Sequence, residues 1–170
     1  FQISNLEEEL DMLASVGGNY IRNTMSSRDQ ENIWAFECKT GEYDLESFNP
    51  DYWDRFHLLL DLTCERDIIV QIELWDRFDF AREPWNNNPF NPLNNINYTE
   101  NESGLKSVVE SHPGKNENRF FYSVPAEDDN QYLLGFQKRY CDKLLCLSLD
   151  YPNVLYCMDN ETCGSPEWGK

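Results

Sequence analysis

The stretch that most constrains the fold is DIIVQIELW, residues Asp67–Trp75, an almost unbroken apolar run between charged residues. A run this short and this apolar is typical of a strand that helices cover in a parallel sheet. Two further segments have the same character, NYIRNTM at residues 19–25 and NVLYCM at residues 153–158. We therefore expect three strands, around residues 19–24, 67–75 and 153–158.

A helical pattern precedes each predicted strand. Leucines at three- and four-residue steps predict a helix over Ser4–Val16, which Gly17-Gly18 ends. Asn49-Pro50 is an N-cap followed by proline at the first helical position, and it opens a helix that reaches about Arg66. Gln131–Leu149 forms the third helix. Alternating helices and strands predict an α/β fold with parallel strands, because βαβ crossovers are right-handed.

Two architectures fit this order, an open doubly wound sheet and an arc of a (β/α)₈ TIM barrel. No G-x-G-x-x-G and no G-x-x-x-x-G-K-[ST] follows a strand, so nucleotide-binding versions lose support. Residues 76–129 are rich in asparagine and proline and have no periodicity, so we expect a long irregular loop of functional importance. A short helix is expected inside it, near Leu105–Glu110.

The charge balance limits the partners. The 14 basic and 31 acidic residues give a formal charge of −17, which repels phosphate backbones and anionic membranes. We therefore expect no nucleic-acid and no membrane partner, and the longest apolar runs are too short to span a bilayer. Neutral substrates such as sugars are compatible with this charge. The solubility that such a charge confers is the simpler alternative explanation.

Polar residues stand where the three predicted strands end. These residues are Arg22, Asn23 and Thr24, then Glu73, Trp75, Asp76 and Arg77, then Asp159, Asn160 and Glu161. In both architectures the carboxyl ends of the strands form the working face. Alternation places Ile69, Gln71, Glu73 and Trp75 on the face that would point into a barrel. A buried Glu73 needs a partner, and Arg22 on the neighbouring strand is the candidate. An ordinary structural ion pair is the alternative.

Three segments carry a family resemblance: LASVGGNYIRNTM, IIVQIELWDRFDF and NVLYCMDNET. They resemble the second, third and fourth strands of (β/α)₈ retaining glycoside hydrolases, the superfamily of cellulases and mannanases. In that superfamily an Asn-Glu pair closes the fourth strand, and the Glu is the general acid/base. The resemblance thus assigns the catalytic role to Glu161 and substrate binding to Asn160. In the superfamily an arginine at the end of the second strand orients the nucleophile, and the resemblance assigns this role to Arg22.

The resemblance implies an incomplete catalytic barrel over residues 1–170, containing about strands 2 to 4. Retaining hydrolysis uses two carboxyl groups about 5–5.5 Å apart. The superfamily takes its nucleophile from the seventh strand, so we expect the second carboxylate to lie beyond Lys170 and this chain alone to be inactive. Two alternatives stay open: a non-catalytic carbohydrate-binding barrel, and an α/β scaffold whose strand-end charges are structural.

Further substrate contacts are expected from Trp34, Trp75, Asp76 and Glu73, because sugar faces stack on aromatic rings and carboxylates accept sugar hydroxyls. Core packing is the alternative for each tryptophan, and Trp53 is assigned to the core. The six cysteines contain no C-x-x-C and give no zinc pattern, so neither a metal nor a cofactor is expected. One or two disulfides are possible, and free cysteines are the alternative. A secreted or periplasmic location is expected, and the oligomeric state is left open.

Overall fold

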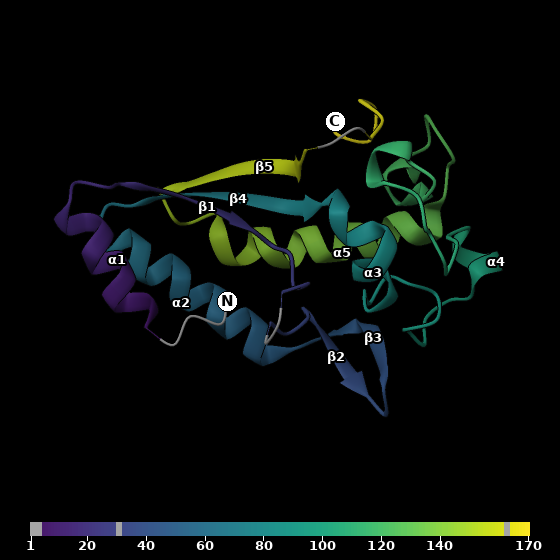
Figure 1. The fold of residues 1–170 in the computed structure, drawn as a ribbon, viewed down its shortest axis with the longest axis horizontal. Coiled ribbons are helices and arrows are strands. Elements are labelled where there is room, and N and C mark those ends of the chain that lie inside the picture. Colours follow the sequence, from purple (N-terminus) through teal and green to yellow (C-terminus); the bar gives the residue numbers. More distant parts are fainter. Residues whose placement is uncertain (1–4, 30–31, 162–163) are drawn as a thin grey trace.

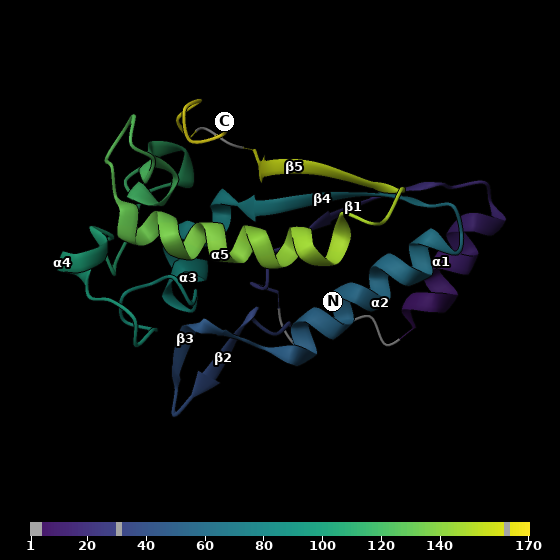
Figure 2. The ribbon, with the colours of Figure 1, turned by 180° about the vertical axis from the view of Figure 1, so that it is seen from behind.

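A computed structural model describes residues 5–29, 32–161 and 164–170. Its centre is a parallel sheet in the order β1-β4-β5, formed by Tyr20–Thr24, Ile69–Asp76 and Val154–Asn160. Helices α1 (Leu6–Ser15), α2 (Pro50–Cys64) and α5 (Gln131–Ser148) lie on one side of this sheet (Figures 1 and 2). The predicted α/β fold with three parallel strands and flanking helices is confirmed.

Helix α2 begins as the sequence predicts. The side chain of Asn49 accepts a hydrogen bond from the backbone N–H of Asp51 at 3.1 Å, and Pro50 takes the first helical position, where no backbone donor is needed. The helix turns Trp53, Phe56 and Leu60 inward, and each of them is at most 3% exposed. Trp53 therefore belongs to the core, as expected.

Strand β4 shows the expected alternation over most of its length. Val70 and Ile72 are fully buried against the helices, whereas Ile69 on the opposite face is 37% exposed. The alternation ends at Leu74 and Trp75, which are consecutive and both buried in the same cluster. The prediction that Trp75 points into a barrel with the polar face is wrong, because its indole packs against rings of the core.

A hairpin lies where the sequence predicted only a loop. Strands β2 (Phe36–Lys39) and β3 (Glu42–Phe48) pair antiparallel around Thr40 and Gly41. Both turn residues have positive φ, +56° and +95°, which suits the two-residue turns that match strand twist. The strands escaped prediction because they are short and mostly polar. Phe36 and Leu45 still anchor the hairpin in the core.

Residues 76–129 lie beyond the carboxyl ends of the strands. In Figure 1 the arrowheads of β4 and β5 point toward this segment. The segment contains only short helices: η1 (Arg77–Phe80), α3 (Arg82–Asn86), α4 (Glu100–Ser103), η2 (Pro113–Lys115) and η3 (Arg119–Tyr122). The prediction of a short helix near Leu105–Glu110 is wrong. That stretch is not helical and buries every second residue, whereas Thr99 and Glu102 form a capping box that starts α4 earlier.

Asparagine side chains fasten this irregular segment. Asn88, Asn91 and Asn95 are each at most 5% exposed, and each accepts a hydrogen bond from a backbone N–H two residues later. Their amide groups also donate to main-chain carbonyls across the segment. Because an asparagine side chain carries both a donor and an acceptor, it satisfies backbone groups that would be hydrogen-bonded to each other in a helix or a sheet. The asparagine-rich composition is therefore a structural requirement of this segment.

Candidate functional site

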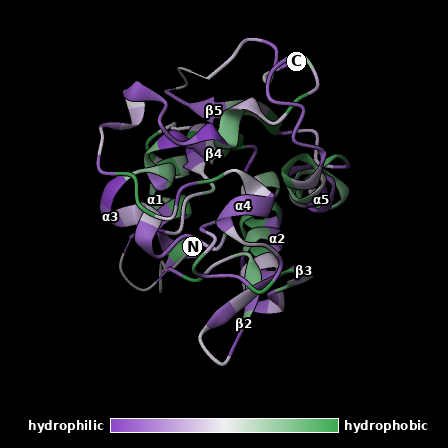
Figure 3. Ribbon diagram, turned by 90° about the vertical axis from the view of Figure 1, so that its right-hand side faces the viewer, coloured by the Kyte–Doolittle hydropathy of each residue, from purple (hydrophilic) through white to green (hydrophobic). Residues whose placement is uncertain are grey.

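The register of the sheet brings the predicted strand-end residues together. Thr24 of β1 lies opposite Glu73 of β4, and Asp76 of β4 lies opposite Asn160 of β5. Figure 3 views the molecule from this end, with the strands above and helices α2 and α5 below. The polar residues of three distant sequence segments therefore share one edge of the sheet.

Glu73 is the most thoroughly paired of these residues. Its side chain is only 4% exposed, and Arg22 Nε lies 2.8 Å from its Oε1. The hydroxyl of Thr24 donates to Oε2 at 2.6 Å, and the amide of Gln71 donates to Oε1 at 3.3 Å. The expectation that Arg22 partners Glu73 is confirmed. These contacts fix the buried carboxyl group of Glu73, and its short contact with Nε holds Arg22 in one orientation.

A second cluster, which sequence reasoning missed, surrounds Arg28. Its Nη1 lies 2.7 Å from Asp76 Oδ2 and 2.9 Å from Asp79 Oδ1, and both carboxylates are buried. The hydroxyl of Ser26 also donates to Asp79 Oδ1 at 2.8 Å. Burial raises the pKa of Asp79 to about 6, although Ser26 and Arg28 act to lower it. The D-x-x-D spacing that begins at the last residue of β4 was the available sequence signal.

Asn160 joins the two clusters. Its Nδ2 donates to Asp76 Oδ2 at 3.2 Å, and its Oδ1 accepts from Arg22 Nη2 at 3.4 Å. A continuous set of contacts thus runs from Glu73 through Arg22, Asn160 and Asp76 to Arg28. An asparagine suits this central place because it donates to a carboxylate and accepts from a guanidinium at the same time.

Glu161 stands next to this network and is not hydrogen-bonded into it. Its backbone has a φ of +50°, which turns the chain out of β5. Its side chain is 65% exposed, and the nearest cation is Arg77, whose Nη2 lies 4.0 Å from Oε2. The described residues therefore leave the Glu161 carboxyl accessible from outside. The burial expected for a general acid is not supplied by this part of the protein.

The two tryptophans predicted to bind substrate differ in position. Trp75 is 5% exposed, and its ring centroid lies 4.8 Å from that of Tyr140 and 5.1 Å from that of Phe120. These contacts favour the core alternative for Trp75. Trp34 is half-buried and lines two open grooves, with volumes of about 560 and 330 Å³. Trp34 is therefore the one of the two that a ligand can reach.

No group of three or more His, Cys, Asp or Glu side chains in residues 5–29, 32–161 and 164–170 is placed to hold a metal ion. Five cysteines, Cys38, Cys64, Cys141, Cys146 and Cys157, are free thiols, and Cys163 lies outside the described residues. No helix in the described part of the chain is long and apolar enough to cross a membrane.

Two solved structures from Rhizomucor miehei share the fold. One is an endo-1,4-beta-mannanase, which matches 94% of this chain at 14% identity with a TM-score of 0.52. The other is a glycoside hydrolase family 5 mannosidase, an E202A mutant in complex with mannosyl-fructose, which matches 95% at 14% identity with a TM-score of 0.55. This chain spans about 40% of the length of each. No protein family and no curated protein sequence matches the chain. The likeness shows that the chain has a fold like that of family 5 glycoside hydrolases.

Proposed function

We propose that the protein is a glycosidase that cleaves O-glycosidic bonds of an oligo- or polysaccharide by a retaining mechanism. The observation that carries the proposal is the contact of Asn160 with both Arg22 and Asp76 at the carboxyl edge of the sheet. Ligand sites of barrels and open α/β folds collect at this edge. The glycosidase fold of the two solved neighbours supports the same reaction class.

Glu161 is the proposed general acid/base. It would protonate the leaving oxygen in the first step and then activate the water that hydrolyses the glycosyl-enzyme. Asn160 would hydrogen-bond a sugar hydroxyl beside the reacting carbon, and the Glu73 pair would hold Arg22 toward the second carboxylate. We place that nucleophile outside these 170 residues. Because Glu161 is exposed here, the surface that buries it during catalysis would come from the same additional part.

The experiment is Glu161→Gln in the full-length protein, assayed on an aryl glycoside with a good leaving group and on a polysaccharide. Turnover of the polysaccharide should fall by a factor of about 10² to 10⁴, the usual contribution of a general acid/base. Added azide should partly restore release of the aryl group, because azide needs no general base. Glu167→Gln is a matched control, since Glu167 is exposed and its carboxylate pairs with Lys170 at the surface. Unchanged turnover in Glu161→Gln would remove Glu161 from the mechanism.

Two alternatives predict different results for sugar binding and for a further variant. A non-catalytic carbohydrate-binding protein, which the accessible ring of Trp34 favours, would bind oligosaccharides without hydrolysis even at full length. A structural scaffold, which the Arg22–Glu73 ion pair favours, would bind no sugar, and Glu73→Gln would change only stability. A secreted or periplasmic location suits an enzyme acting on polymers outside the cell, and we include it in the proposal.

A further inference from the structure

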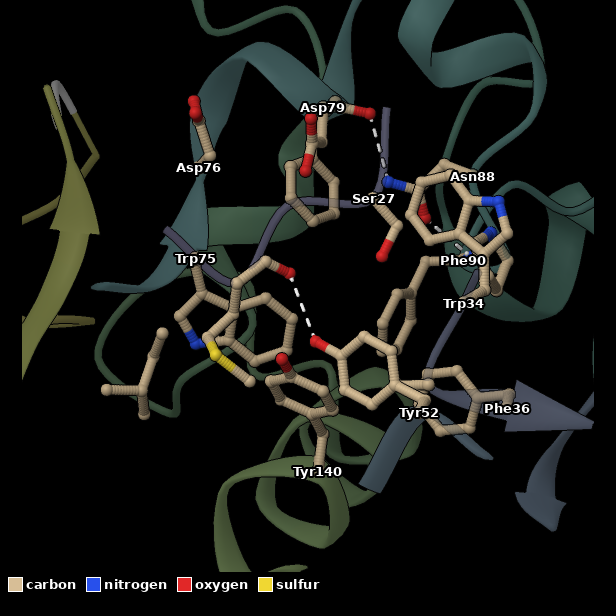
Figure 4. Close-up of a pocket in the computed structure, with 15 residues that line it drawn as sticks. Ser27, Trp34, Phe36, Tyr52, Trp75, Asp76, Asp79, Asn88, Phe90 and Tyr140 are labelled. Atoms are coloured by element: carbon tan, nitrogen blue, oxygen red, sulfur yellow. Dashed lines mark hydrogen bonds between the residues drawn. The ribbon is translucent and has the colours of Figure 1, made fainter. Parts of the chain in front are cut away.

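A small cavity lies beside Trp34, which also lines the two grooves. Its volume is about 40 Å³. The carboxyl of Asp79 and the hydroxyl of Ser27 point into this space, and the rings of Tyr52 and Tyr140 form its opposite wall (Figure 4). The lining therefore combines aromatic rings with polar side chains.

Two oxygens facing the cavity have unused hydrogen-bonding capacity. Asp79 is 5% exposed, and Ser26 and Arg28 both donate to its Oδ1, whereas no described residue donates to its Oδ2. Ser27 is 6% exposed, and its hydroxyl makes no hydrogen bond with another residue in the described part of the chain. Asp79 Oδ2 can therefore accept a hydrogen bond from a group that enters the cavity, and the Ser27 hydroxyl can donate or accept one.

The size of the cavity limits what that partner can be. A water occupies about 10–15 Å³ on this scale, so 40 Å³ has room for two to four groups of that size. Trp34 lines the cavity and both grooves, and Ser27 lines the cavity and the smaller groove. A ligand stacked on the exposed side of Trp34 can therefore reach the cavity with a short side arm.

We propose that this cavity binds the exocyclic hydroxymethyl group of a hexose unit whose ring stacks on Trp34. The inference rests on the proposed carbohydrate function and specifies a hexose-containing substrate. The hydroxyl of the arm donates to Asp79 Oδ2 and accepts from Ser27, while its methylene contacts the aromatic wall. A pentose such as xylose has no such arm in its pyranose ring, so both buried oxygens stay without that partner. Sites built to hydrogen-bond a hydroxyl reject analogues that lack it.

The test is calorimetric titration of the chain with mannotriose, cellotriose and xylotriose. Wild type should bind at least one of the two hexose trisaccharides about tenfold or more tightly than xylotriose. Ser27→Val fills the cavity and should reduce the hexose affinity to the xylotriose level. Ser27→Ala removes only the hydroxyl and should have a smaller effect in the same direction. The matched control is Ser15→Val on the exposed surface of α1, which should leave all three affinities unchanged.

The outcomes separate this inference from the proposed function. Equal binding of all three sugars, unchanged in Ser27→Val, would overturn the cavity assignment and leave a carbohydrate function standing. Hexose preference in wild type that survives Ser27→Val would also overturn it, because the discrimination would then arise elsewhere. Absence of binding to any of the three would overturn both the assignment and the saccharide-binding role of Trp34.

Discussion

The buried amide of Asn91 gives the sharpest prediction about what holds the segment 76–129 in place. Asn91 is 2% exposed. Its Nδ2 donates to the carbonyls of Trp85 at 3.0 Å and Ser107 at 2.9 Å, and its Oδ1 accepts from the N–H of Leu93 at 3.0 Å. Asn91→Asp keeps the shape of the side chain and removes both donors. It therefore isolates the hydrogen bonds from the packing.

The expected cost follows from the two carbonyls left without donors. A buried polar group that loses its partner costs about 1–3 kcal/mol, so Asn91→Asp should lower the free energy of unfolding by about 2–6 kcal/mol at pH 7. A small domain has only about 5–15 kcal/mol of stability in total, so the effect is large. Lowering the pH toward 4 should recover part of it, because a protonated carboxyl regains one donor.

Urea unfolding followed by tryptophan fluorescence measures this cost, since Trp85 lies beside Asn91. Asn101→Asp is the matched control. Asn101 is exposed on α4 and makes no side-chain hydrogen bond in the described part of the chain, so the same substitution there should change stability by less than about 0.5 kcal/mol. If Asn91→Asp costs no more than Asn101→Asp, side-chain amides do not hold this segment together.

Four further outcomes follow from the structure. Burial raises the pKa of Asp79 from 3.8 to about 6, so the folded state binds this proton more tightly than the unfolded state does. As the pH rises from 4 to 6, the free energy of unfolding of wild type relative to Asp79→Asn should therefore fall by up to ~3 kcal/mol. A difference that stays constant with pH in chemical unfolding would refute this. Arg28→Met removes the cation that pairs with two buried carboxylates, so it should cost about 3–5 kcal/mol in urea unfolding at pH 7 and less at pH 5. Trp75→Ala should cost about 3–5 kcal/mol in the same assay, whereas Trp34→Ala should mainly weaken saccharide binding in calorimetry. Asn49→Ala removes the N-cap of α2 and should lower the free energy of unfolding by about 1 kcal/mol, measured by thermal unfolding.

Local signals predicted the regular elements well. The Asn49-Pro50 pair starts α2 because a cap and a fixed φ act within a few residues of themselves. The apolar run of β4 fixes a strand buried by helices, because its composition allows little else. The same alternation that places Glu73 away from the helices also identified Arg22 as its partner. These inferences depend on neighbours in sequence or on one adjacent strand.

Long-range contacts decided the rest of the site. Arg28 lies in a loop with no pattern, and only the fold brings it to Asp76 and Asp79, about fifty residues away. Trp75 was assigned to the ligand face by alternation, but the rings of α5 and of the segment 76–129 hold it in the core.

The sequence by itself determined three parallel strands with acidic and amide residues at their ends, because apolar run length and alternation follow from local burial. Only the tertiary structure decided which of those residues touch. It linked Asn160 to Arg22 and Asp76, left Glu161 exposed, and enclosed the oxygens of Ser27 and Asp79 in one cavity. The reason is physical: contacts between residues far apart in the chain depend on the packing of the whole fold, and no local pattern encodes them.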